Sequence, residues 1–171
     1  MGGFEIRDAC VADYSVFAAI YNEAIESRRA TMDTEPIAAG YFETYRADDQ
    51  ALLAAVLDGE PLGWGIVKRY SDRPGYRVAC ETSLYFYAEH TGQGYGGRLL
   101  DALVERAAAL AYAHLVAKIL AVNKASVRFH ERHGFEVVGI QRRIGKLDGH
   151  WQDVVILQRI LADSRSRRTR A

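Results

Sequence analysis

Apolar residues recur along most of this chain with the spacing of amphipathic helices or of strands. Spacings of three and four predict four helices, at residues 11–27, 36–46, 94–110 and 123–133. Pro36 suits the first turn of the second helix. Asn123 suits the N-cap of the fourth, and Gly134 the position just beyond its end.

The remaining apolar stretches are rich in β-branched and aromatic residues, which favours strands. They predict seven strands, at residues 4–7, 51–57, 62–70, 76–87, 115–122, 136–144 and 151–161. The turn residues 58–61 and Asp148-Gly149 each predict a hairpin. The resulting order, βααβββαβαββ, indicates an α/β fold with a mixed sheet and helices on both of its faces.

Composition narrows the class of protein. The chain has 171 residues and 49% hydrophobic content, which suits one domain, expected over residues 1–162. Its 22 basic and 22 acidic residues balance, so no overall charge favours nucleic acid or a membrane as a partner. Four arginines lie in residues 163–171, which we interpret as a disordered basic tail, with contact to a polyanion as the alternative.

The spacing of the cysteines bears on metal binding, and the lack of a long apolar run bears on cellular location. Cys10 and Cys80 lie far apart and match no metal-binding or redox spacing, so we expect reduced thiols and no metal site. No apolar run reaches the roughly 18 residues of a membrane span, and no basic and then apolar leader opens the chain. These features predict a soluble cytoplasmic protein.

A glycine-dense turn, residues 92–97, follows the strand that is predicted to end at Tyr87 and precedes a helix. Glycine lets a backbone approach a ligand closely, and the first N–H groups of a helix bind anions. The turn lacks the Lys of a P-loop, because Arg98 and Leu99 follow Gly97. It also lies too late in the chain for a dinucleotide fingerprint. These exclusions favour coenzyme A as the phosphate ligand, and a loop that merely needs positive φ is the alternative.

Several stretches together resemble the Gcn5-related N-acetyltransferases, and within them the phosphinothricin and methionine sulfoximine N-acetyltransferases. The likeness covers nearly the whole chain. It is carried by Ile20-Tyr21-Asn22, residues 30–36 (ATMDTEP), 73–77 (RPGYR), 81–85 (ETSLY), 130–135 (HERHGF) and 149–154 (GHWQDV). The resemblance implies a mostly antiparallel sheet, acetyl-CoA as co-substrate and transfer of the acetyl group to a small amino-acid-like amine. It also implies a homodimer.

The catalytic assignments come from this resemblance. It places the general base at Glu81, where a solvent-facing strand residue is the alternative. It places the donor to the developing oxyanion at the amide of Phe86 or Tyr87. It places a general acid for the departing thiolate at His130, where many relatives have a tyrosine in that role, and a surface histidine is the alternative. Cys80 neighbours Glu81 on a strand and should point to the opposite face, which argues against a covalent cysteine intermediate.

The resemblance also supplies the expected binding residues. Those for the cofactor are Tyr85, Phe86, Tyr87, Gln93, Gly94, Tyr95, Gly96, Gly97, Arg98, Asn123 and Ser126. Thr91 stands where the wider family has Gln or Arg, so backbone amides must contribute more of the phosphate binding. Those for the substrate are Thr31, Met32, Arg73, Tyr76 and Arg77. An arginine fork suits a carboxylate or phosphinate, although exposed loop arginines are common.

Three alternatives stay open at this stage. One is acetylation of peptide amino termini, and another is acetylation of polyamines. A need for acidic pocket residues in place of Arg73 and Arg77 would separate these two from an amino-acid-like substrate. The third is a catalytically silent regulator that binds coenzyme A, against which the presence of Glu81 argues.

Overall fold

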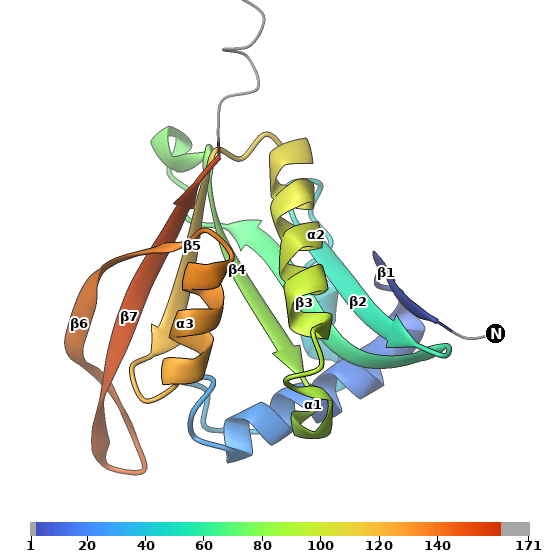
Figure 1. The fold of residues 1–171 in the computed structure, drawn as a ribbon, viewed down its shortest axis with the longest axis horizontal. Coiled ribbons are helices and arrows are strands. Elements are labelled where there is room, and N and C mark those ends of the chain that lie inside the picture. Colours follow the sequence, from blue (N-terminus) through green and yellow to red (C-terminus); the bar gives the residue numbers. More distant parts are fainter. Residues whose placement is uncertain (1–2, 162–171) are drawn as a thin grey trace, which may run out of the picture.

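The computed structural model describes residues 3–161, and its centre is a seven-stranded mixed sheet (Figure 1). The strands, in the spatial order β1-β2-β3-β4-β5-β7-β6, are β1 (Phe4–Asp8), β2 (Ala51–Leu57), β3 (Glu60–Arg69), β4 (Ala79–Phe86), β5 (His114–Leu120), β7 (His150–Ile160) and β6 (Glu136–Leu147). The α-helices are α1 (Tyr14–Glu26), α2 (Tyr95–Ala109) and α3 (Lys124–Arg132). The expected residues 163–171 of the tail lie outside the described part of the chain.

One pair of strands is parallel, and it locates the opening in the sheet. Every other neighbouring pair is antiparallel, whereas β4 and β5 run parallel. Their pairing covers only Ala79 to Glu81 on β4 and His114 to Val116 on β5. Beyond Glu81 the two strands separate, as Figure 1 shows, so the sheet is split at its centre. The predicted mixed, mostly antiparallel fold is confirmed.

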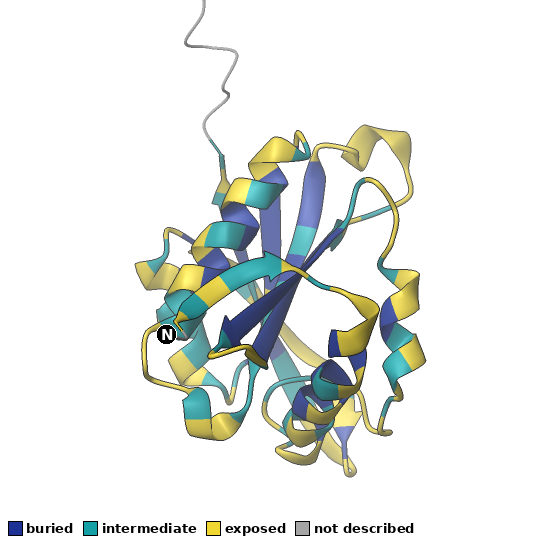
Figure 2. Cartoon of the chain, turned by 90° about the vertical axis from the view of Figure 1, so that its right-hand side faces the viewer, coloured by how far each residue is buried: buried dark blue, intermediate teal, exposed yellow. Residues whose placement is uncertain are grey.

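Helices cover both faces of the sheet, as expected. The core on one face gathers around α2, whose Leu99, Leu100 and Leu103 are fully buried, with Phe129 of α3 at its edge. The core on the other face is aromatic and gathers around Phe17 and Tyr21 of α1. Figure 2 shows the buried strands between these exposed outer helices.

The predicted helix at residues 36–46 is wrong. The structure has a 3-10 helix, Ala39–Thr44, and Ala38 just before it is extended. The Asn22 side chain of α1 explains the difference, because it bonds both the N–H and the C=O of Ile37, at 2.8 and 3.0 Å. A helix that starts at Pro36 would direct the Tyr41 amide to the Ile37 carbonyl, but this amide donates to the Ala38 carbonyl at 3.0 Å, and the Ile37 carbonyl accepts from Asn22 instead.

The predicted strand at residues 76–87 begins three residues too early. Pro74–Tyr76 forms a single 3-10 turn, closed by the Arg77 amide, which donates to the Pro74 carbonyl at 3.3 Å. The fixed φ of proline favours such a turn, so β4 starts only at Ala79. The glycine-turn helix, the Asn-capped helix and the closing hairpin lie within a few residues of their predicted ends.

Candidate active site

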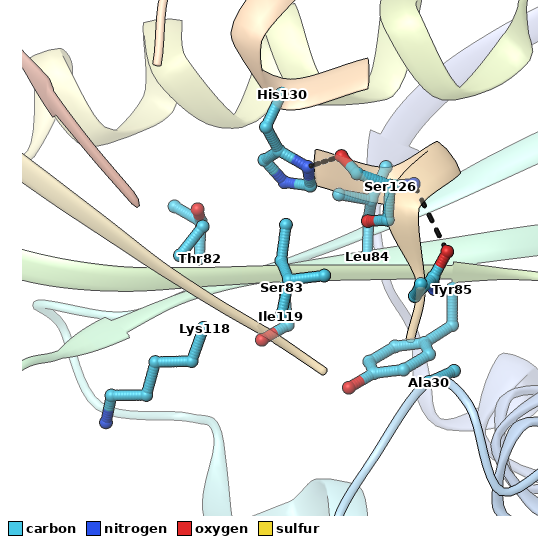
Figure 3. Close-up of a pocket in the computed structure, with 11 residues that line it drawn as sticks. Ala30, Thr82, Ser83, Leu84, Tyr85, Lys118, Ile119, Ser126 and His130 are labelled. Carbon is cyan, nitrogen blue, oxygen red and sulfur yellow. Dashed lines mark hydrogen bonds between the residues drawn. The ribbon is translucent and has the colours of Figure 1, made fainter. Parts of the chain in front are cut away.

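The opening between β4 and β5 forms a pocket of about 70 Å³. Figure 3 shows that it is lined by both strands and by α3. The lining residues are Ala30, Thr82, Ser83, Leu84, Tyr85, Ala117, Lys118, Ile119, Asn123, Ser126 and His130. His130 and the Lys118 ammonium group lie on opposite sides of the two strands (Figure 3). The pocket therefore passes through the sheet and joins its two faces.

The glycine turn leads into the N-terminus of α2 beside this opening. Gly92 and Gly94 have φ of +77° and +88°, a conformation that other residues rarely adopt. Gly94 is the N-cap and supplies no capping side chain, so the first amides of α2 have no side-chain partner there. This donor set, at the positive end of a helix, fits a diphosphate.

Gly96 and Gly97 serve a different purpose from the two glycines before them. A Cβ on Gly97 would lie 2.9 Å from the His133 ring, and one on Gly96 would lie 3.5 Å from Phe129. Phe129 belongs to α3, and His133 directly follows it. Gly97 has no room for a Cβ and so lets α2 approach the end of α3 closely, whereas the distance at Gly96 is an ordinary van der Waals contact. The anion-binding end of α2 and the pocket-lining face of α3 are held together in this way.

The side chains of the turn are directed elsewhere. Gln93 Nε2 donates to the Glu89 carbonyl at 3.0 Å, and the Tyr95 ring stacks on Phe4. The Arg98 guanidinium lies over the same Phe4 ring, 4.3 Å from its centre. The turn therefore offers its backbone, rather than these side chains, to a ligand.

The amides of β4 divide between the two neighbouring strands. The Tyr87 amide donates to the Leu62 carbonyl of β3 at 3.2 Å, so it is not free to bind an oxyanion. Successive amides in a strand point to opposite sides. The amides of Leu84 and Phe86 therefore point toward β5, across the gap. Of the two predicted oxyanion donors, the geometry favours Phe86, and it adds Leu84.

Helix α3 presents three of the predicted residues to the pocket. Asn123 Oδ1 accepts the Ser126 amide at 3.2 Å, so Asn123 caps the helix, and both residues line the pocket. His130 is buried, and burial lowers the pKa of its imidazole below the usual value of 6.5.

The hydrogen bond of His130 fixes its tautomer. Nδ1 lies 2.9 Å from the Ser126 carbonyl, which can only accept. Nδ1 therefore carries the proton, and in the neutral ring Nε2 has a free lone pair. A proton-donating role would require the imidazolium, which burial disfavours.

Glu81 lies at the point where β4 and β5 separate, and its side chain is 14% exposed. Its carboxylate lies between two ammonium groups: Lys118 Nζ is 2.8 Å from Oε2, and Lys68 Nζ is 3.4 Å from Oε1. Cys80 faces the opposite core and is fully buried, which raises the pKa of its thiol to about 12. A thiol that stays protonated is a poor nucleophile, as its predicted orientation already suggested.

The predicted substrate residues fall into two groups around Glu81. Thr31 and Met32 lie in the segment after α1, where the Thr31 hydroxyl is 2.7 Å from the Tyr21 hydroxyl. A Cβ on Gly145 of β6 would meet the Met32 methyl group, so this segment contacts the closing hairpin. Thr31 therefore lies against α1, and Met32 lies against β6.

The second group occupies the turn before β4. Arg73, Tyr76 and Arg77 are all exposed there. The Tyr76 ring packs edge-on against Tyr70, with ring centres 5.6 Å apart. Lys118 Nζ lies 5.8 Å from the centre of the same Tyr70 ring. The arginine-bearing turn is thus linked through two tyrosines to the residue that pairs with Glu81.

Sequence reasoning missed Lys68, Lys118 and Thr82. Lys68 faces Glu81 in the register of β3 and β4, and Lys118 lies two residues beyond the last β4–β5 pair. A lone lysine within an apolar strand was the available signal, but its partner depends on strand order. Thr82 is buried, and its hydroxyl has no partner among the described residues.

Comparison with known proteins identifies the same family as the resemblance in the sequence. The Acetyltransferase (GNAT) family model matches residues 17–135. An L-methionine sulfoximine/L-methionine sulfone acetyltransferase of Pseudomonas aeruginosa is 36% identical over 166 residues, 94% of this chain and 96% of the relative.

Solved structures agree with this match. A GNAT superfamily phosphinothricin acetyltransferase from Sinorhizobium meliloti, in complex with AcCoA, has a TM-score of 0.89 and 28% identity, covering 95% of this chain and 91% of that one. A ribosomal-protein-alanine N-acetyltransferase from Brucella melitensis has a TM-score of 0.88 and 31% identity, covering 92% and 99%.

The chain belongs to the Acetyltransferase (GNAT) family and is an acetyltransferase. Within residues 3–161, no helix is long and apolar enough to cross a membrane. The same residues hold no group of three His, Cys, Asp or Glu side chains placed to bind a metal.

Proposed function

We propose that this protein transfers the acetyl group of acetyl-CoA to the amine of a small amino-acid-like substrate, by direct attack within a ternary complex. The observation that carries the proposal is the opening between β4 and β5. It has the anion-binding start of α2 on one face of the sheet and the Glu81 carboxylate on the other. Two substrates that enter from opposite faces can meet in such an opening.

Acetyl-CoA supplies an acetyl group activated as a thioester. The amides at the start of α2 bind its diphosphate, and Asn123 and Ser126 line the path to the pocket. The amides of Leu84 and Phe86 stabilise negative charge that develops on the carbonyl oxygen. The phosphate and oxyanion contacts use backbone donors. This agrees with Thr91, which stands where the wider family has the longer side chain of Gln or Arg.

Glu81 prepares the amine for attack. An aliphatic ammonium has no lone pair at pH 7, so its proton must first pass to the Glu81 carboxylate. The nitrogen lone pair then attacks the thioester carbon, and the electrons of the C=O double bond move onto its oxygen. When this adduct collapses, the C–S bond breaks, its electron pair leaves on sulfur, and the second proton of the nitrogen passes to the thiolate or to solvent. A thiol pKa near 8.5 makes the thiolate an adequate leaving group without an acid. The predicted acid role of His130 remains a prediction.

The substrate class follows from the charges around Glu81 and from the relatives. Lys68, Lys118, Arg73 and Arg77 place positive charge around the carboxylate and in the nearby turn. This positive charge suits an amine that also carries a carboxylate or phosphinate, as in methionine sulfoximine or phosphinothricin. It disfavours polyamines, which are cations throughout.

We further propose a homodimer in the cytoplasm. Apolar side chains are exposed along the closing hairpin, and β6 is an edge strand. Val138, Ile140, Ile144 and Trp151 are each at least half exposed. A second copy that packs on this hairpin would cover them. The two cysteines are free, which suits a reducing compartment.

The test is a thiol-release assay with acetyl-CoA and a panel of amines. The panel contains L-methionine sulfoximine, phosphinothricin, spermidine and a short peptide with a free amino terminus. We expect turnover with the first two and little with spermidine. Turnover with the peptide alone would favour a protein-acetylating enzyme, and failure to bind acetyl-CoA in calorimetry would contradict the proposal.

A further inference from the structure

Glu81 is the predicted base, yet an ion pair occupies it. Lys118 Nζ is 2.8 Å from one carboxylate oxygen, and Lys68 Nζ is 3.4 Å from the other. The three side chains together carry one net positive charge. A substrate ammonium that approaches Glu81 therefore meets two like charges as well as the carboxylate.

The two lysines differ in where they are attached. Lys68 lies opposite Glu81 on β3, where β3 and β4 are continuously paired. Lys118 lies on β5, two residues past Val116, the last residue of β5 that pairs with β4. Lys118 thus lines the pocket, and its side chain reaches back across the opening to Glu81. The contact between Lys118 and Glu81 spans the place where a substrate would sit.

The ion pair between Lys118 and Glu81 can be replaced by a pairing of Lys118 with another anion. The Lys118 side chain is 46% exposed, so its ammonium group is accessible to another partner, whereas the Glu81 side chain is only 14% exposed. Its Nζ lies 5.8 Å from the centre of the Tyr70 ring, so a second favourable contact holds the ammonium group when Glu81 releases it. A substrate that brings an anion to Lys118 and a cation to Glu81 leaves neither charge without a partner, which avoids the cost of an unpaired buried carboxylate.

An α-amino acid has the matching charges. Its ammonium group pairs with Glu81, and its carboxylate lies one carbon away, on the side where Lys118 reaches across. The Tyr70 ring beneath Lys118 packs on Tyr76, which belongs to the turn that carries Arg73 and Arg77. That turn brings further cations toward the acidic end of the same substrate.

We propose that Lys118 determines substrate specificity by binding the acidic group of the amine substrate, which takes the place of Glu81 as the partner of its ammonium group. Glu81 is thereby released to receive the substrate ammonium. An amine without an acidic group leaves the Lys118–Glu81 pair in place. The inference rests on the proposed function and names the residue that selects its substrate class.

The experiment compares L-methionine sulfone with its carboxamide, which keeps the amine and lacks the carboxylate. Values of kcat/KM are measured at one pH for the wild type, Lys118→Met, Lys118→Arg and the matched control Lys68→Met. The control also removes a cation from Glu81, but one outside the pocket lining. Thermal unfolding checks that each variant is folded.

We expect Lys118→Met to lower kcat/KM for the acid by about 10- to 100-fold, mainly through KM. The value for the amide should stay the same or rise, because the variant no longer pairs with Glu81. Lys118→Arg should keep most of the preference for the acid, and Lys68→Met should leave that preference unchanged. Equal losses for acid and amide in Lys118→Met, or equal effects of the two Met variants on the preference, would overturn the assignment. A wild-type enzyme that acetylates neither compound would instead contradict the proposed function.

Discussion

The environment of each residue at the opening of the sheet depends on the elements packed beside it. Glu81 and Cys80 are adjacent in sequence, yet one joins a cluster of charges and the other an apolar core, because strand residues alternate faces. His130 is a histidine on a short helix, but its burial and its bond to Ser126 decide which nitrogen holds the proton.

Glu81→Gln should lower kcat by about 100-fold or more, because the amide cannot accept the proton of the substrate ammonium. The remaining activity should rise with pH as the free amine accumulates in solution. Steady-state rates between pH 6 and 10 measure this. Calorimetry with acetyl-CoA is the control and should show little change in affinity. A pH profile identical to that of the wild type would remove Glu81 from the base role.

His130 should stay neutral at pH 7, because burial disfavours its charged form and lowers its pKa. The unfolded chain, with an ordinary pKa near 6.5, then binds more protons, so His130 contributes stability above about pH 6.5 that is lost as the pH falls. NMR titration of the ring, assigned with His130→Gln, measures the pKa. A value above 6.5 would restore the case for His130 as an acid.

At the scale of elements, close packing between helices and strands shapes the opening. Gly97 allows α2 to approach α3, and Gly65 allows α2 to approach β3, where a Cβ would lie 2.7 Å from Leu103. The Asn22 side chain of α1 bonds the backbone of Ile37 and so ties the segment after α1 to that helix, and Met32 of this segment contacts Gly145 of β6. Each of these contacts joins elements that lie far apart in sequence.

Gly65→Ala should destabilise the protein by about 1–3 kcal/mol, because Leu103 is fully buried and cannot move aside freely. Gly139→Ala is the matched control, since this strand glycine has no neighbour within 4 Å of an added Cβ. The control should be neutral or slightly stabilising. Urea unfolding followed by circular dichroism compares the two, and equal stabilities would show that α2 does not pack on β3 as described.

At the scale of the whole molecule, the split sheet and the exposed hairpin are the two features with functional consequences. In the proposed function, the split lets two substrates meet from opposite faces. The hairpin leaves apolar side chains on β6 and β7 uncovered in a single copy of the chain. Soluble monomers rarely leave a group of apolar side chains exposed unless it binds another molecule.

Ile140→Glu should convert the proposed dimer into a monomer, because a carboxylate buried between two copies would be left without a partner. Sedimentation velocity at several protein concentrations measures the change. Val11→Glu, a substitution of an exposed apolar residue at the other end of the sheet, should leave the dimer intact. A monomeric wild type would refute the dimer itself.

The amino-acid sequence alone determined most of the elements and the chemistry of the glycine turn. Periodicity, capping by Asn123 and the punctuation of glycine and proline are local signals, so they can be recognised without a fold. The resemblance in residues 81–85 and 130–135 then indicated Glu81 and His130. Local signals failed at residues 36–46, where the contact between Asn22 and Ile37 overrides a good helix start.

Tertiary structure decided how these residues work together. The pairing of Glu81 with Lys68 and Lys118 depends on strand order and register, which no local pattern encodes. The choice of Leu84 and Phe86 over Tyr87 depends on which strand receives each amide. Both depend on contacts between residues far apart in the sequence, because a hydrogen bond or ion pair between strands exists only once the sheet has assembled.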